Sequence, residues 1–532
     1  MAEEKEKIKI KLLNVRHPFN ETPDLTLLVS ATLGIAEKEV TSVQIIRRSV
    51  DARQERLDMV YTLAIELVAA KQVLSDILKK KDVEIHKPAP APVAHKIKSN
   101  TYDPVIIGCG PAGLFAALTL IERGAKPIII ERGARMGKRI RDVNQFWKNG
   151  ALNTESNVLF GEGGAGTFSD GKLTTRIKSP LKEKALHELV KFGAPEEIRY
   201  INKPHLGTDR IRHIICAVVE SLEQKGVRFL FETKVQTIEV QDGHINGIRT
   251  EDQFIKADTV FLGSGHSARD IYDSLKQHGV VLEAKGFAVG LRIEHPQELI
   301  NRVQWGKWSG TPGLGPADYF LTYTDELSRR GVYTFCMCPG GYVITCSSHQ
   351  AELTTNGMSA YLRDSPWANA AVVVTIGPED FNSLDPLSGI EFQRALERKA
   401  FSMGGKNFMV PAQPARAFLK GKETAEHSFS CSCLPGAVPA DLNELLPEFV
   451  SRPLKQGLEH FDKKIPGFID EGILFGVESR TSSPVRIKRS AHNFHAIGAK
   501  GLIPIGEGSG YAGGIMSCAV DGIRAALSFD QD

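Results

Sequence analysis

Two pairs of cysteines, each with one residue between its members, are the first groups in the sequence that point to chemistry. Cys336 and Cys338 fall on a predicted strand, 332–338, and the alternation of a strand places both thiols on one face with Thr334. Such thiols act as a redox relay or a proton donor, or they are small apolar core residues, as free cysteines usually are. Cys431 and Cys433 lie far away in sequence, and a single-residue spacing is not typical of zinc or iron–sulfur ligands. We therefore expect no metal site.

Two basic side chains stand on loops whose composition indicates a ligand site. Lys172 ends the loop 163–172, which is rich in glycine and hydroxyl groups, and is either a catalytic group or a solvated lysine. Arg480 lies on a Ser/Thr-rich loop, where a guanidinium can hold an anionic substrate; the alternative is an ion pair with Glu478. The catalytic candidates are therefore Lys172, Cys338 and Arg480, with His205 and His295 as further acid–base candidates.

The glycine-rich segment 108–113 stands between a short apolar strand and a helix, where a dinucleotide-binding turn is expected. Gly108 permits a tight turn, Gly110 leaves room for a pyrophosphate, and Gly113 lets the helix and the strand pack closely. The helix N-terminus adds free N–H groups and a positive dipole. A second apolar strand ends at Glu131, whose carboxylate can accept both ribose hydroxyls. This order predicts a Rossmann unit that binds a dinucleotide.

Three further segments favour FAD over NAD as that dinucleotide. Strands predicted at 236–240, 244–250 and 253–257 form a β-meander where an ordinary Rossmann fold has a helix, and the strand 258–262 leads into Gly263-Ser264-Gly265. Near the C-terminus, a strand at 501–505 precedes a glycine-rich loop and a helix at 515–527. Glu507 in this loop can accept a ribityl hydroxyl, and the helix start provides positive dipole for a reduced flavin.

These features together resemble the glutathione-reductase-like flavoproteins. The segments 160–173, 336–341, 356–359, 363–366 and 478–486 are similar to those of the bacterial FAD-dependent dehydrogenases often called NAD(FAD)-utilising dehydrogenases. The likeness covers essentially the whole chain, including the N-terminal unit with its segment 48–53, and implies the fold and FAD but no particular substrate. The segment around Cys431 and Cys433 departs from the family pattern. A second dinucleotide fingerprint is missing, so we expect no resident NAD(P)H domain, although a transient NAD(P)H at the flavin remains open.

The residues expected to contact FAD come from the fingerprint, the loop 163–172, two strand ends and the C-terminal loop. They are Gly108, Gly110, Pro111, Ala112, Gly113, Glu131, Arg132, Arg139, Gly163, Gly164, Gly166, Thr167, Val235, Gly263, Ser264, Gly265, Gly506, Glu507, Gly513, Gly514 and Ile515.

The expected fold is α/β with three parts. Residues 1–86 form a small ferredoxin-like α+β domain, in which 59–67 is either a strand or a helix, and residues 87–99 form a Pro/Ala-rich linker. A glutathione-reductase-like FAD-binding Rossmann domain is built from 100–285 and 465–532. A mixed, β-rich substrate domain at 286–464 covers the flavin.

Composition narrows the class of protein. The 532 residues carry a net charge of only +3, without a strongly basic stretch, which disfavours a nucleic-acid partner. An apolar run of about 18 residues is missing, so no membrane span is expected. A charged start without an apolar leader and only eight cysteines favour the cytoplasm.

The function that follows is an FAD-dependent oxidoreductase, a dehydrogenase or reductase that passes a hydride through flavin N5 to or from a small-molecule substrate. Two alternatives remain open. One is a flavin-dependent modification of RNA or protein, with the N-terminal domain as a recruiting module. The other is a non-catalytic FAD-bound scaffold or sensor.

Overall fold

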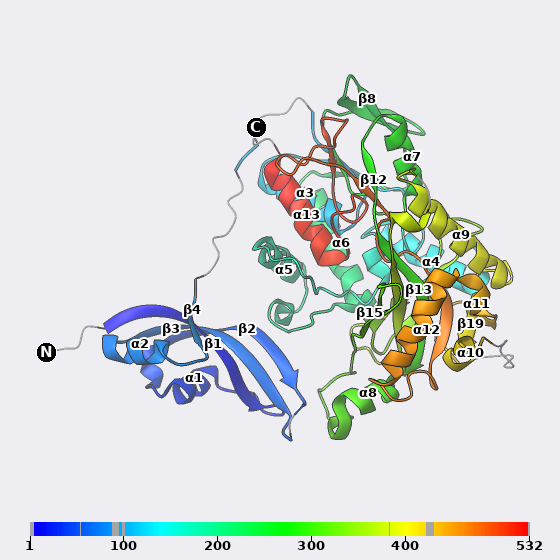
Figure 1. Cartoon of the computed structure of the whole chain (residues 1–532). Helices are drawn as coiled ribbons and strands as arrows, with labels where there is room; N and C mark the ends of the chain where they lie inside the picture. Colours follow the sequence, from blue (N-terminus) through cyan, green and yellow to red (C-terminus); the bar gives the residue numbers. More distant parts are fainter. Residues whose placement is uncertain are drawn as a thin grey trace. The chain divides into compact units, whose positions relative to one another are not determined.

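The computed structural model describes residues 5–53, 55–87, 95–97, 102–381, 384–421 and 430–529. The linker expected at 87–99 therefore lies almost wholly outside the described residues. The chain divides into two compact units. Unit 1 contains Met1–Pro92 with Leu186–Lys191 and Pro195–Pro204, and unit 2 contains Val93–Ala185, Phe192–Ala194 and His205–Asp532 (Figure 1).

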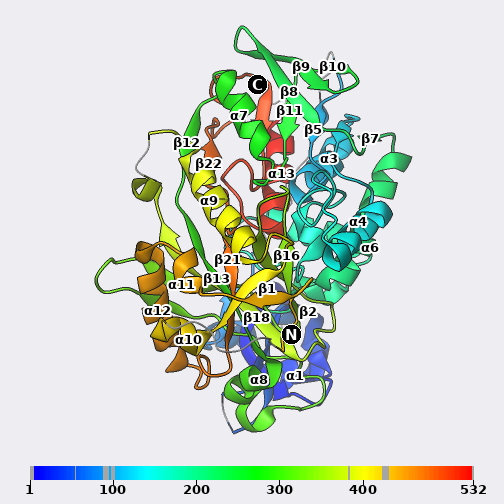
Figure 2. The same cartoon turned by 90° about the vertical axis from the view of Figure 1, so that its right-hand side faces the viewer.

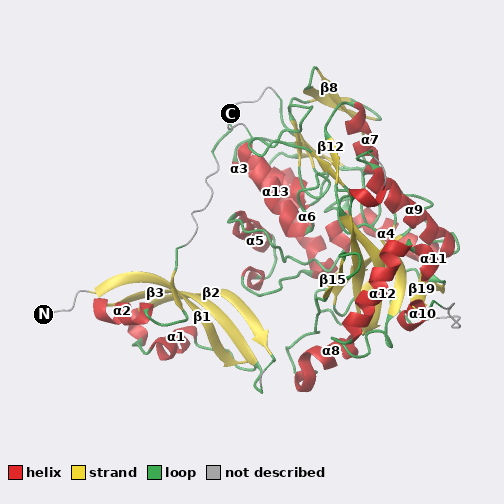
Figure 3. Cartoon of the chain, viewed as in Figure 1, coloured by secondary structure: helices red, strands yellow, loops and turns green. Residues whose placement is uncertain are grey.

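Unit 1 contains an antiparallel sheet with the strand order β2-β3-β1-β4. Residues 59–67 form part of a strand, so the strand alternative is correct there. Asp24 caps the first helix, because its side chain accepts the N–H groups of Thr26 and Leu27. Both helices pack against one face of the sheet (Figure 3). The elements are β1 (Lys5–Pro18), α1 (Leu25–Leu33), β2 (Val40–Asp51), β3 (Asp58–Ala70), α2 (Lys71–Leu78) and β4 (Val83–Ile85).

A five-stranded parallel sheet in unit 2 has the order β23-β11-β5-β6-β7. Its central strands are wholly apolar and buried, as is usual where helices cover both faces of a parallel sheet. The helices α3 and α13, which are far apart in sequence, lie side by side (Figure 1). The elements are β5 (Val105–Ile107), α3 (Pro111–Glu122), β6 (Ile128–Ile130), α4 (Met136–Asn149), α6 (Gly207–Gln224), β7 (Arg228–Leu230), β11 (Val260–Leu262), α7 (Arg269–Gln277), β23 (Leu502–Pro504) and α13 (Ile515–Ser528). Helix α5 (Leu181–Lys191) begins in unit 2, and its residues from Leu186 onward belong to unit 1.

The predicted meander is a separate three-stranded sheet, made of β8 (Val235–Gln241), β9 (His244–Thr250) and β10 (Phe254–Lys256) (Figure 2). Strand β7 does not continue into the meander. It ends at Leu230, and the chain turns through Glu232 at φ 52° before β8 begins. This turn lets the chain leave the parallel sheet and enter the meander.

A seven-stranded mixed sheet forms the core of the rest of unit 2, in the order β14-β15-β18-β13-β21-β19-β20. Its strands and helices are β13 (Phe287–Pro296), α8 (Gln297–Trp305), β14 (Thr322–Thr324), β15 (Gly331–Cys338), β18 (Trp367–Ile376), α9 (Ser388–Met403), β19 (Val410–Pro414), α10 (Ala415–Lys420), β20 (Ala437–Pro439), α11 (Leu442–Leu445), α12 (Glu448–Asp462) and β21 (Ile473–Glu478). The pairs β12 (Leu282–Ala284) with β22 (Val485–Ile487), and β16 (Tyr342–Cys346) with β17 (Thr354–Met358), complete the unit.

Strand β21 lies outside the domain predicted for it. The boundary expected at 465 would place it in the FAD domain, but it pairs with β13 and β19 inside the seven-stranded sheet. Leu474 and Phe475 are buried in the core of that sheet, which explains the pairing. Among the described residues, no helix is long and apolar enough to cross a membrane.

Candidate functional site

The turn between β5 and α3 has the geometry that its glycines predict. Gly108 has φ 102°, and a Cβ there would lie 2.4 Å from the carbonyl oxygen of Gly263. A Cβ at Gly113 would lie 2.1 Å from the carbonyl oxygen of Gly108, so this residue allows the helix to pack on the strand. A Cβ at Gly110, in contrast, would meet only Gly164, at 3.8 Å. Gly110 thus leaves open space beside the helix N-terminus.

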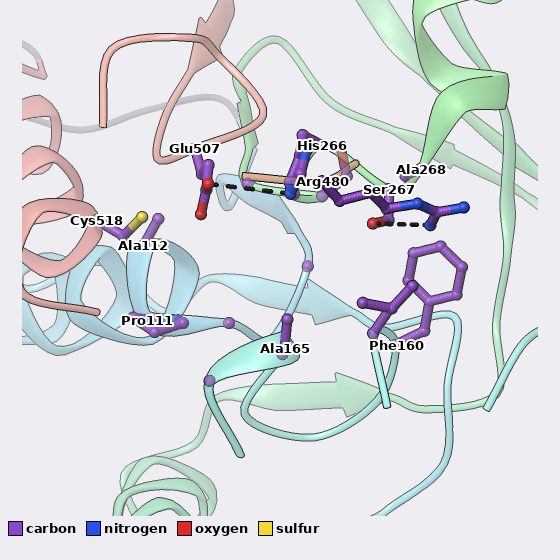
Figure 4. Close-up of a pocket in the computed structure, with 18 of the residues that line it drawn as sticks. Pro111, Ala112, Phe160, Ala165, His266, Ser267, Ala268, Arg480, Glu507 and Cys518 are labelled. Carbon is purple, nitrogen blue, oxygen red and sulfur yellow. Dashed lines mark hydrogen bonds and ion pairs between the residues drawn. The ribbon is translucent and has the colours of Figure 1, made fainter. Parts of the chain in front are cut away.

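That space belongs to an elongated cavity lined by both ends of unit 2's sequence. Its lining begins at Glu131, Arg132 and Val235, passes Gly108, Gly110 and the end of β11, and continues to Glu507, Gly514 and Ile515. Figure 4 shows Ala112 beside Cys518, with Pro111 below them and Glu507 above. Of the expected FAD contacts, the described lining includes Gly108, Gly110, Pro111, Ala112, Glu131, Arg132, Gly164, Gly166, Val235, Gly263, Ser264, Gly265, Glu507, Gly514 and Ile515.

Glu131 organises one end of this cavity. Its carboxylate accepts the backbone N–H groups of Cys109, Gly133 and Gly161, each at 2.9 Å. The neighbouring Arg132 pairs with Glu155 and Asp270, and its guanidinium lies 4.3 Å from the ring centroid of Phe160. Glu131 therefore joins three backbone segments by hydrogen bonds, at the place where the sequence predicts contact with a ribose.

Arg139, Gly163 and Thr167 support the loop and are not among the described residues that line the cavity. The guanidinium of Arg139 is fully buried and donates to the carbonyl oxygens of Asn157, Val158 and Glu162. The Thr167 hydroxyl donates to Glu162 as well. These bonds fix the backbone that presents Gly164 and Gly166 to the cavity. Gly113, Gly506 and Gly513 also lie outside the described lining.

The C-terminal loop supplies an acid at the other end. Burial raises the pKa of Glu507 to about 7. The Glu507 carboxylate lies 3.9 Å from Nε2 of His266 (Figure 4). Burial, with Arg480 and Arg269 nearby, lowers the pKa of His266 to about 3, so this imidazole is neutral. His266 was not among the site residues predicted from the sequence, although it directly follows the predicted segment 263–265.

Lys172 lies at this end, within an ion-pair cluster. Its Nζ is 2.6 Å from Asp170 Oδ2, and Asp170 also accepts two hydrogen bonds from Arg363. Although burial opposes it, the charges of Lys172 and Arg363 lower the pKa of Asp170 to about 2. Burial also opposes the charge on Lys172, but Cys338 and Asp170 raise its pKa above the usual range. The lysine is therefore held as a cation at the cavity wall.

The cysteines of β15 do not follow regular strand alternation. The pairing register with β18 shifts between Phe335 and Cys338, and Cys336 has φ 46°. Because of this bulge, Cys336 and the exposed Phe335 both reach the cavity, whereas Cys338 is fully buried and is not in the described lining. The expectation of one shared face with Thr334 therefore fails at Cys336.

Arg480 lines the cavity, but its charge is already paired. It donates to both carboxylate oxygens of Glu397, at 2.9 and 2.7 Å, and to Ser348. It also donates to the hydroxyl of Ser267 (Figure 4). The alternative partner named from the sequence, Glu478, pairs with Arg292 instead. The pairing with Glu397 could not be predicted from the sequence, because Glu397 lies on α9, far from Arg480 along the chain.

The remaining candidates lie elsewhere. Nε2 of His205 lies 3.0 Å from the Tyr361 carbonyl oxygen, and Nε2 of His295 lies 2.7 Å from that of Phe468. Neither histidine is in the described lining. The eight cysteines are free thiols, and the described residues contain no group of three or more Cys, His, Asp or Glu arranged for a metal ion. Thr355 and Asn356 also line the cavity. Of these two, only Asn356 lies in a segment that resembles the family, 356–359.

The cavity has open space and backbone donors that suit FAD. A Cβ on Gly265 or Gly514 would meet no described atom within 4 Å, so both glycines border open space. The N-termini of α3 and α13 reach this space at Pro111 and Ile515, and both can bind anionic or electron-rich groups of a dinucleotide.

Three family models match the chain. Residues 286–481 match an FAD-dependent protein, C-terminal domain-like, and residues 103–154 match an FAD binding domain. Residues 9–66 match a domain of unknown function.

Relatives extend this assignment. An uncharacterised protein of Clostridium beijerinckii is 44% identical over 527 residues, which cover 97% of this chain and 98% of that protein. Protein FixC of Salmonella typhi is 25% identical over 249 residues, covering 43% of this chain and 54% of FixC. The crystal structure of L-proline dehydrogenase from P. horikoshii aligns with a TM-score of 0.37 and 12% identity, over 82% of this chain and 93% of that one. The cofactor is FAD, and the chain belongs to an uncharacterised family of FAD-dependent proteins.

Proposed function

We propose that this protein is an FAD-dependent oxidoreductase, a dehydrogenase or reductase that exchanges a hydride with a small-molecule substrate. One observation carries the proposal: the cavity that begins at Gly110 and Glu131 also reaches Lys172, Cys336 and Glu507. A cofactor held by the glycine turn therefore has chemically active side chains at its far end. Bound FAD supplies two-electron chemistry at the flavin N5 atom.

The chain's own residues support a role in binding and orientation. Lys172 presents a cation at the wall, where it can hold an anionic group of the substrate. Phe335, Thr355 and Asn356 provide an apolar surface and polar groups beside it. Arg480 positions the wall through Glu397, since its hydrogen bonds are made within the protein.

Similarity to the FixC proteins and to an E. coli protein named a probable electron transfer flavoprotein-quinone oxidoreductase also supports oxidoreductase chemistry. The low net charge supports a small-molecule partner over a nucleic acid. We further infer a glutathione-reductase-like FAD domain, from the meander beside the parallel sheet. A ferredoxin-like fold for the N-terminal unit is supported by its strand order, β4-β1-β3-β2, and its βαββαβ element order.

The test is an absorption spectrum of the purified protein, followed by anaerobic titration with NADH and with NADPH. We expect flavin bands near roughly 370 and 450 nm, released as FAD on denaturation, and loss of the longer-wavelength band with an electron donor. A Lys172→Met variant should bind FAD equally but react more slowly with an anionic donor. Protein that stays free of flavin after reconstitution with FAD would refute the proposal.

A further inference from the structure

We propose that Cys336 and Cys338 form a redox-active dithiol–disulfide pair that exchanges two electrons with the bound flavin. This inference rests on the FAD site of the proposed function, but not on the identity of any substrate. It assigns a role to a pair of thiols that an oxidoreductase acting only on a small molecule would not need.

The bulge in β15 brings the two cysteines into contact. In a regular strand, residues two apart lie about 6.7 Å from one another, near the upper limit of Cα separation for a disulfide. Here Cys336 takes a left-handed backbone conformation, with φ 46°, which L-residues seldom adopt. As a result, the Cys338 thiol donates to the carbonyl oxygen of Cys336 at 3.4 Å. Local strain at a bulge beside a cavity is typical of functional sites.

The pair spans the boundary between the cavity and the core. Cys336 lines the cavity together with Glu507, Gly514 and Ile515, which are the residues at the predicted flavin end. Cys338 lies beneath it, with no exposed surface. One thiol can therefore meet a cofactor or a substrate, while the other is protected and acts as the resolving partner.

Two cations flank the pair. Nζ of Lys172 lies 3.9 Å from Cys338 Sγ, and Nη1 of Arg292 lies 3.5 Å from the Cys336 carbonyl oxygen. A Cβ built on Gly357 would be 2.6 Å from Arg292 Nη1 and 2.9 Å from Cys338 Sγ, so guanidinium and thiol converge on one small space. Each cation has its own carboxylate, Asp170 for Lys172 and Glu478 for Arg292.

This environment favours a thiolate at Cys336. The neighbouring Cys338 thiol lowers the pKa of Cys336 to about 6; burial opposes this, and the charges of Lys172 and Arg292 add to it. The proximity of Cys336, with burial, raises the pKa of Cys338. The remaining proton of the pair therefore resides on Cys338. A low-pKa thiol beside a resolving thiol is the arrangement of dithiol redox centres.

The electron count balances with FAD as the oxidant. The Cys336 thiolate, the Cys338 thiol and oxidised FAD give one disulfide and anionic reduced FAD: the Cys338 sulfur–hydrogen bond breaks, an S–S bond forms, and two electrons with one proton pass to the flavin. In the reverse direction, reduced FAD opens the disulfide, and Nζ of Lys172 is placed to return a proton to Cys338. The opened pair can then reduce a disulfide or another electrophilic substrate that enters the cavity.

The chain provides a matched control in its second CxC pair. Cys431 and Cys433 have the same spacing, but neither is among the described residues that line the cavity. Burial raises the pKa of both thiols. We expect this pair to take no part in the exchange.

The experiment counts reducing equivalents in the FAD-bound protein after mild oxidation with oxidised dithiothreitol. Anaerobic dithionite titration of the wild type should consume four electrons per flavin, two for FAD and two for the disulfide. Cys336→Ser and Cys338→Ser should each consume two, whereas Cys431→Ser should still consume four. Peptide mass spectrometry of the oxidised wild type should show a peptide containing residues 336–338 that is lighter by two hydrogens and resists alkylation.

Wild type that consumes only two electrons, with both thiols still alkylated, would overturn the proposal, even if a variant proves too unstable to purify. Its failure is distinguishable from that of the proposed function. A protein that consumes two electrons but is reduced by NADH or NADPH keeps the oxidoreductase and loses the relay. Consumption of four electrons without reduction by either nucleotide keeps the relay and calls for another donor.

Discussion

Glu397 is the residue whose neutralisation should most disturb the cavity wall. Its carboxylate is fully buried and bridges Arg480 and Arg269 through hydrogen bonds of 2.7–3.0 Å. These guanidinium groups outweigh burial and hold the pKa of Glu397 below its usual range. Glu352 is the second carboxylate of the cluster, 3.0 Å from Arg269 and 3.6 Å from Arg480. In Glu397→Gln, two buried cations would share this one anion.

The expected cost follows from that imbalance. Removing one partner of a buried ion pair destabilises a protein by about 4 kcal/mol. Unit 2 has roughly 420 residues, and an unfolding entropy of about 2.1 cal/mol/K per residue gives about 0.9 kcal/mol per kelvin. The melting temperature of unit 2 should therefore fall by roughly 4–5 °C.

The assay is thermal unfolding followed by intrinsic fluorescence, with release of the flavin as a second signal. Glu391→Gln on the same helix is the control, because Glu391 is 60% exposed and pairs with Arg394 at the surface. That variant should melt within about 1 °C of the wild type, since exposed pairs contribute about 1 kcal/mol or less. If Glu397→Gln melts as the control does, the cluster does not stabilise the cavity wall as argued.

Three further perturbations separate cofactor binding, thiol chemistry and acid–base chemistry. Gly110→Ala should keep the fold, because its Cβ would meet only Gly164 at 3.8 Å, but should weaken FAD binding at least about tenfold by filling the cavity; unchanged FAD content would contradict this. Alkylation of Cys336 by iodoacetamide should be half-maximal near pH 6, since its thiolate is lost as the pH falls through that value, and Cys338→Ala should move the midpoint upward; a midpoint near 8.5 in the wild type would disagree. Glu507 has a raised pKa, so its contribution to stability is present at low pH and is lost as the pH rises through about 7. Glu507→Gln should therefore raise the melting temperature of FAD-free protein at pH 8 and leave it unchanged at pH 5; equal effects at both pH values would count against this account.

Much of the cofactor site was predictable because its signals are local. The turn at Gly108, the close helix packing at Gly113 and the acid at Glu131 each follow from a residue type at a fixed distance from a strand. The meander and the C-terminal loop were predictable for the same reason, since alternating apolar residues and glycines indicate strands and turns directly.

Arg139 and Thr167 show the limit of that reasoning. Both belong to segments that contact the cavity, but their side chains turn away and bind backbone carbonyls. Sequence proximity to a binding loop does not determine side-chain direction, which depends on the partners available in the fold.

By itself, the sequence determined the dinucleotide unit, the identity of the cofactor and the residues able to do chemistry, because these depend on composition and spacing along a few turns of chain. Only the tertiary structure decided which of those residues reach the cavity. A one-residue bulge placed Cys336 on the wall and Cys338 beneath it, and helix α9 brought Glu397 to neutralise Arg480. The physical reason is that bulges and buried ion pairs are set by the pairing of strands and helices far apart in sequence, and the local pattern does not encode that pairing.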